Sequence, residues 1–171
     1  MTPDRLLPQR PFPAYAFLPG RDPHPTRDPA GHSAGNEDHP APQDLPRPHE
    51  WPSSPDYLYG IDLYNYGYLW EAHEAWEGLW HLAKNDPDSQ RADFLQGLIQ
   101  CAAATLKVRM GQPRGVVALA GMGTERLARV ATQRNGDYMN LDVTSFVEAF
   151  RTFAASQPED IQARPMIVLD H

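Results

Sequence analysis

Cysteine is almost absent from this sequence: 171 residues contain only Cys101. A single cysteine excludes an intrachain disulfide, and small secreted domains usually depend on several. Cys101 lies in an apolar run with helical spacing, where a thiol most often acts as a small core side chain. We therefore expect a cytoplasmic protein with a buried, unreactive cysteine.

Positive charge and long apolar runs are also scarce. Fifteen lysines and arginines stand against 22 acidic residues, for a formal net charge of −7, and no basic block occurs. Nucleic-acid binders need a basic patch, so we expect no nucleic-acid partner. No apolar run approaches the roughly 20 residues that cross a bilayer, and prolines interrupt the first twenty residues, so we expect no membrane partner and no secretion signal.

Two kinds of catalytic motif are missing. No serine stands in a glycine-framed turn of the kind that presents a nucleophile. The "GMG" at 121–123 follows no strand, so it does not resemble a phosphate-binding loop. Any chemistry must therefore come from other ionisable groups.

Proline divides the chain near residue 56, because fourteen of the eighteen prolines precede it. The length suits one domain, so we divide the chain into an extended Pro-rich arm over 1–55 and a helical bundle domain over 56–171. The arm carries Phe12, Tyr15 and Phe17, which we expect to pack on the bundle.

The arm also carries three histidines, His24, His32 and His39, at spacings that match no standard zinc pattern. Isolated histidines in a polar loop are usually solvated. We therefore expect these three to lie in solvent.

After residue 56 the apolar spacing is helical, and the cap and stop residues predict where each helix ends. The expected helices cover 56–66, 68–84, 88–110, 113–132 and 142–156, the last capped by Asp142, and the closing residues suit a docked tail. Strands have almost no room. The sequence thus predicts an all-α fold, a compact bundle of about five helices built from helical hairpins.

The segment "WEAHEAWEGLW" at 70–80 holds three tryptophans, three glutamates and one histidine. At about 100° per residue, His73 and Glu77 share the face of Trp76 and Trp80, while Glu71 points further away. An unpaired buried polar group costs about 1–3 kcal/mol, so His73 and Glu77 need partners. Gln96, Gln100 and Lys107 on the next helix fall within about 40° of one another and could supply them in a shared buried network.

Three interpretations of this cluster stay open. It can be a structural His, Glu and Gln network, or a pocket for a small polar or cationic molecule with tryptophan walls. The ligand-binding set would then be His73, Glu77, Trp76, Trp80, Gln96, Gln100 and Lys107. The sequence leaves a homo-oligomer open as well.

The third interpretation is a divalent metal bound by His73, Glu74 and Glu77, with Glu74 or Glu77 as the base of a metal-dependent hydrolase. However, "HEAWE" has glutamate where the zincin motif H-E-x-x-H has its second histidine, and Trp70 occupies the position of the glutamate in E-x-x-H di-iron motifs.

The stretch "YNYGYLWEAHEAWEGLW", followed by "FLQGLIQCAAATLKVRMGQPRG", resembles the domain-of-unknown-function family 309. That family combines E-A-H-E-x-W-E-x-x-W on one helix with Q-G-L-I-Q and a downstream glycine on the next, and the resemblance covers about residues 57 to 130. It implies a compact helical bundle and brings no established activity. The motif positions map to Glu71, His73, Glu74, Trp76, Glu77, Trp80, Gln96, Gly97 and Gln100.

Overall fold

The computed structural model describes residues 1–35, 41–87 and 89–170. Its helices are η1 (Pro48–Ser53, a 3-10 helix), α1 (Pro55–Asn65), α2 (Leu69–Ala83), α3 (Ser89–Arg109), α4 (Pro113–Gln133) and α5 (Val143–Ala155). Within these residues the only strands are β1 (Asp137–Tyr138) and β2 (Leu141–Asp142), which pair antiparallel. The all-α prediction is confirmed. No helix of the described chain is long and apolar enough to cross a bilayer.

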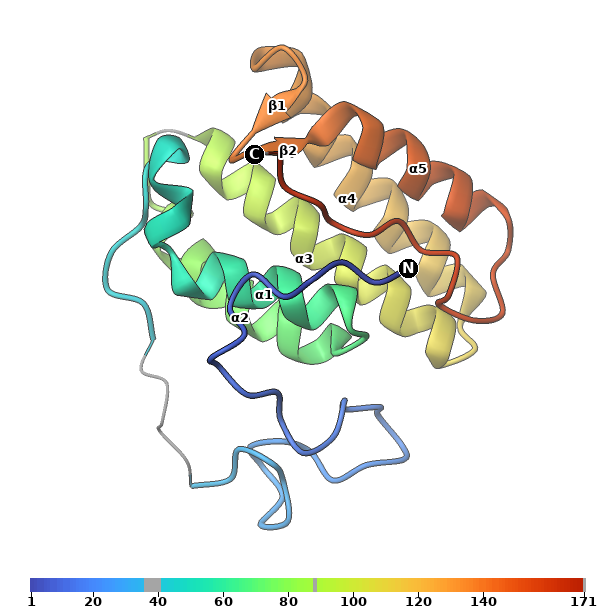
Figure 1. The fold of residues 1–171 in the computed structure, drawn as a ribbon. Helices are drawn as coiled ribbons and strands as arrows, with labels where there is room; N and C mark the ends of the chain where they lie inside the picture. Colours follow the sequence, from blue (N-terminus) through green and yellow to red (C-terminus); the bar gives the residue numbers. More distant parts are fainter. Residues whose placement is uncertain (36–40, 88, 171) are drawn as a thin grey trace.

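Each α helix packs against the next one along the chain, as successive hairpins require (Figure 1). Local residues set the boundaries. The Ser54 side chain accepts the backbone N–H of Tyr57 at the start of α1, and Gly67, with φ of +86°, makes the turn into α2. Asp142 caps α5 by accepting the N–H of Ser145 at 2.9 Å. Serine and aspartate are favoured residues at the start of a helix, and glycine is favoured in the turn that follows its end.

Two close contacts between helices depend on glycine. Gly60 of α1 lies against the indole of Trp76 in α2, and a Cβ atom at Gly60 would overlap the indole Nε1. In α3, a Cβ at Gly97 would come within 2.6 Å of Leu127 Cγ, and one at Gly123 of α4 would lie 2.9 Å from the Gly97 carbonyl oxygen. Glycine at 97 and 123 therefore sets the spacing of α3 and α4.

The first part of the arm lies on α1. Near its other end the arm forms the short helix η1, which was not expected from the sequence. The Asp62 carboxylate, 1% exposed, accepts the backbone N–H groups of Leu6 and Leu7 at 2.7 and 2.9 Å, and Arg5 Nε at 3.3 Å. The Phe12 ring stacks on Tyr68 with centroids 4.8 Å apart. Apolar and charge-assisted contacts thus hold the first part of the arm on the bundle.

The C-terminal tail docks on the same helix. The Asn65 amide donates to the Ile167 carbonyl at 2.8 Å and accepts the Ile167 N–H at 2.9 Å. Arg164 donates to the last carbonyls of α1, those of Tyr64 and Asn65. From there the tail runs back to β2, where Leu169 bridges to Leu141 (Figure 1).

We predict that Gly60→Ala destabilises the protein by roughly 1–3 kcal/mol, the usual cost of overpacking a core, because the new methyl group must displace Trp76. Gly121→Ala is the matched control, since a Cβ there meets nothing within 4 Å and alanine suits a helix better than glycine. Urea unfolding measures both. Equal stability of Gly60→Ala and the parent would contradict the packing described here.

Candidate functional site

Helix α2 brings His73, Glu74 and Glu77 together. His73 Nδ1 lies 3.3 Å from Glu74 Oε1, and His73 Nε2 lies 3.1 Å from Glu77 Oε2. One possible ligand atom from each residue lies within 4.8 Å of the other two. The side chains are 30%, 47% and 34% exposed, so the cluster lies at the surface.

The predicted burial of this cluster is therefore wrong. Among the described residues, no hydrogen bond joins His73 or Glu77 to Gln96 or Gln100; Gln100 is buried with its Oε1 unpaired, and Gln96 is half-buried. The physical reason is that a residue at the edge of an apolar stripe can turn its polar end to solvent while its stem packs. The wheel angle alone does not separate these two outcomes.

The other predicted ligand-binding residues do not line one cavity with this cluster. Trp76 is fully buried and donates its indole N–H to the Tyr57 carbonyl at 3.3 Å, so it belongs to the core. Trp80 is partly buried, with the Lys84 ammonium 5.3 Å from its ring centroid.

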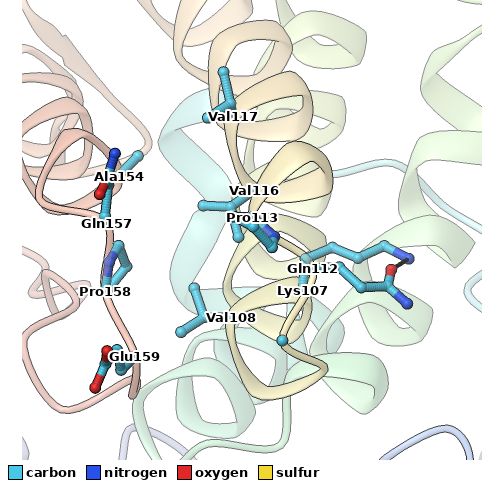
Figure 2. A pocket seen from close by; sticks show the side chains of 11 residues that line it. Lys107, Val108, Gln112, Pro113, Val116, Val117, Ala154, Gln157, Pro158 and Glu159 are labelled. Atoms are coloured by element: carbon cyan, nitrogen blue, oxygen red, sulfur yellow. Dashed lines mark hydrogen bonds between the residues drawn. The ribbon is translucent and has the colours of Figure 1, made fainter.

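Lys107 lies at a different place, beside a cavity of about 470 Å³ between the α3–α4 turn and the end of α5. Its ammonium donates to Gln112 Oε1 at 2.8 Å, and the pair turns away from Ala154 and Pro158 (Figure 2). Val108, Val116 and Val117 make much of the lining apolar. Gln157 and Glu159 add polar side chains to this lining, which does not include His73, Glu74 or Glu77.

Glu71 and His32 form a buried ionisable pair in the described part of the chain. His32 Nε2 lies 2.8 Å from Glu71 Oε1, and their side chains are 3% and 4% exposed. The same oxygen accepts the Phe17 N–H at 2.9 Å. The expectation that His32 lies in solvent is wrong, because the arm folds over this face of α2. Glu71, which was predicted to point away from the site, contacts the arm.

The other arm predictions have mixed outcomes. Phe17 is buried, with its ring edge-on to Trp70 of α2, whereas Tyr15 packs within the arm against the His32 ring. His24 also lies in the arm against Trp70, and His39 is outside the described residues. Two of the three aromatic side chains, Phe12 and Phe17, thus pack on the bundle as expected.

A cavity of about 350 Å³ lies where the arm crosses α1 and α2, and we name it the arm–hairpin pocket. Its polar and aromatic lining comes from both parts of the chain: Arg10, His32 and Ser33 of the arm, and Asp56, Tyr59, Trp70, Glu71 and Glu74 of the helices. Charged groups of both signs therefore face one small space.

Two buried polar atoms of this lining have no hydrogen-bond partner among the described residues: Glu71 Oε2 and Arg10 Nε. The rest of each group is well held. Arg10 Nη1 lies 3.3 Å from Asp56 Oδ1, and the guanidinium carbon is 3.9 Å from the Tyr59 ring centroid. Buried polar groups are nearly always paired in folded proteins, and in this lining the pairing within the described chain is incomplete at these two atoms.

Glu74 links the pocket to the surface cluster, and its pKa is raised above the ordinary value. Burial is the main cause, because it disfavours the charged carboxylate. The nearby His73 opposes the shift, while the charges of Glu77 and Glu71 add to it. Folding therefore makes ionisation of Glu74 less favourable than it is in the unfolded chain.

We predict that Glu74→Gln leaves the protein as stable as the parent or slightly more stable at pH 7 in the presence of a chelator. A carboxyl whose pKa is raised by folding destabilises the folded state above that pKa, and this effect disappears below about pH 4, where both states are protonated. Because the side chain is half-exposed, we expect a gain within about 0.5 kcal/mol.

Thermal melts at pH 4 and pH 7.5 measure this difference. Glu125→Gln on α4 is the control, since the Glu125 side chain is 75% exposed and should show no comparable pH-dependent gain. A Glu74→Gln protein clearly less stable than the parent at pH 7.5 would contradict the prediction.

Comparison with known proteins agrees with the motifs. A family model matches residues 57–119, from the first turn of α1 into α4, and this range includes Glu71, His73 and Glu74 but not the arm. The comparisons with curated proteins and with solved structures gave no match. The segment that carries the α1–α2 hairpin and α3 therefore matches the family described as Domain of unknown function (DUF309).

Proposed function

We propose that this protein binds a small polar molecule in the arm–hairpin pocket. One observation carries the proposal: Arg10 and Glu71 line the same cavity, and each has one buried polar atom, Arg10 Nε and Glu71 Oε2, that lacks a partner among the described residues. A purely structural network would be expected to pair such atoms, since leaving each of them unpaired costs about 1–3 kcal/mol.

The size and lining of the pocket support this proposal. Its volume of about 350 Å³ is near the lower end of the roughly 300–1,000 Å³ that is usual for ligand sites. The expected chemistry of tryptophan walls and a carboxylate counter-charge is found here in Trp70 and Glu71. In this proposal they take the roles that the sequence analysis gave to Trp76, Trp80 and Glu77.

We predict that Ala75→Leu, which fills the pocket from α2, weakens binding of a small polar molecule at least tenfold. Ala103→Leu on α3 is the matched control, because Ala103 is equally half-buried and lies outside this lining. Ligand-observed NMR with mixtures of small amines, acids, amides and sugars gives the readout. Absence of any binding to the parent, or equal binding to Ala75→Leu, would contradict the proposal.

A second candidate function is divalent metal binding by His73, Glu74 and Glu77, favoured by the three ligand atoms that converge within 4.8 Å. Histidine and glutamate four residues apart on a helix can chelate one ion. When bound, such an ion would make its water more acidic, and whichever of Glu74 and Glu77 is not a ligand could accept the proton. The metal-dependent hydrolase predicted from the sequence would work in this way.

If this cluster is a metal site, we predict that the parent binds one equivalent of Zn²⁺ or Mn²⁺. We also predict that His73→Ala and Glu77→Gln each weaken metal binding at least tenfold. His49→Ala is the control, since the His49 side chain is 73% exposed and lies 4.0 Å from the single carboxylate of Glu50. Elemental analysis and calorimetric titration measure these effects. Equal metal binding by parent and His73→Ala would exclude this site.

We further infer that the arm over 1–55 and the bundle over 56–171 act together, since the pocket takes its walls from both. A cytoplasmic location fits the single cysteine, because Cys101 is buried and burial raises the pKa of its thiol, which leaves it unsuited to disulfide exchange. The acidic composition supports a small molecule rather than a nucleic acid as partner.

A further inference from the structure

The charges that line the arm–hairpin pocket are mainly negative. Asp56, Glu71 and Glu74 contribute three carboxylates, whereas Arg10 is the one arginine or lysine among the described residues of the lining. Arg10 already pairs with Asp56 at 3.3 Å. Glu71 and Glu74 are then left facing the pocket with only histidine to offset them, and a cation is the favoured occupant.

The hydrogen-bond demands of the two unpaired atoms are opposite. Glu71 Oε2 is an acceptor and needs a donor, whereas Arg10 Nε is a donor and needs an acceptor. A simple anion would satisfy the arginine and be repelled by the carboxylates. A simple ammonium ion would satisfy the glutamate and leave the arginine unpaired.

The aromatic lining agrees with a cationic occupant. Trp70 and Tyr59 both line the pocket, and aromatic side chains attract cations through the negative charge of their ring faces. The Tyr59 ring already holds the Arg10 guanidinium, and Phe17 and His24 pack against the Trp70 ring, so a ligand cation would contact the part of Trp70 that lines the pocket. The small volume of about 350 Å³ restricts the occupant to a short molecule.

We propose that the ligand is a small organic ammonium compound that also carries a hydrogen-bond acceptor a few bonds from its nitrogen, as an amino alcohol or an amino acid does. Its ammonium group donates to Glu71 Oε2, and its acceptor takes the N–H of Arg10 Nε. This inference rests on the proposed function, because it names the chemistry of the molecule that the pocket holds.

The test compares three short probes with the full chain: ethanolamine, which has both groups, ethylamine, which has only the cation, and acetate, which has only the acceptor. Chemical shifts of the tryptophan indole N–H groups report binding at millimolar concentrations. We expect ethanolamine to bind at least fivefold more tightly than ethylamine, and acetate to leave the spectrum unchanged.

Two variants assign the groups. Glu71→Gln keeps a side-chain oxygen for the Phe17 N–H but loses the charge, and should weaken both amines at least tenfold. Arg10→Lys keeps the charge but loses Nε, and should reduce ethanolamine binding to the level of ethylamine. Glu125→Gln, on the exposed face of α4, is the control and should bind like the parent. If Glu71→Gln does not fold, Arg10→Lys still tests the assignment.

Several outcomes would overturn the inference: equal binding of ethanolamine and ethylamine to the parent, binding of acetate, or amine binding that Glu71→Gln leaves intact. These differ from failure of the proposed function itself. That failure would appear as no probe and no mixture component binding to the parent, or as Ala75→Leu binding them equally well. If a ligand of another class binds to the parent and not to Ala75→Leu, the ammonium assignment is wrong, but the pocket is still the binding site.

Discussion

Helix α1 is enclosed on almost every side, and this enclosure determines how both ends of the chain are placed. Every residue from Tyr57 to Asn65 is buried, including the polar Asp62 and Asn65. Burying such side chains without partners is costly. Among the described residues, the hydrogen-bond partners of these two side chains come from the arm and the tail and not from the other helices. Asp62 takes backbone N–H groups of the arm, and Asn65 pairs with the backbone of the tail at Ile167. The arm and tail thus complete the core.

The pocket is a consequence of how the arm is anchored. Asp62 of α1 holds it at Leu6 and Leu7, and Glu71 of α2 holds it again at Phe17 and His32. The chain between these anchors must cross from one helix to the next. Because prolines and small residues form much of this crossing, it covers the helices incompletely and leaves the cavity that Arg10 and Glu71 share.

The helices were predictable because their signals are local. Apolar spacing, Asp142 as a cap and the glycine turn at Gly67 all act within a few residues, and the structure uses them as expected. Ser54, which was not predicted as a cap, acts in the same local way at the start of α1. The site was only partly predictable. The wheel grouped His73 with Glu77, but it could not show that the arm covers Glu71, because His32 is 39 residues away in sequence and belongs to no helical period. Burial of a helix residue by a segment that is distant in sequence produces no periodic pattern in that sequence.

The attachment of the arm does not by itself explain a carboxylate at position 71. Both arm contacts, from Phe17 and His32, reach one oxygen of Glu71, and the side-chain oxygen of a glutamine could accept the Phe17 N–H equally well. The second oxygen makes no hydrogen bond to the described part of the arm and is a buried acceptor without a partner, which is costly. Glu71 and Arg10 line the same cavity, and each keeps one buried polar atom without a partner among the described residues, which a bound molecule that reached both atoms would account for.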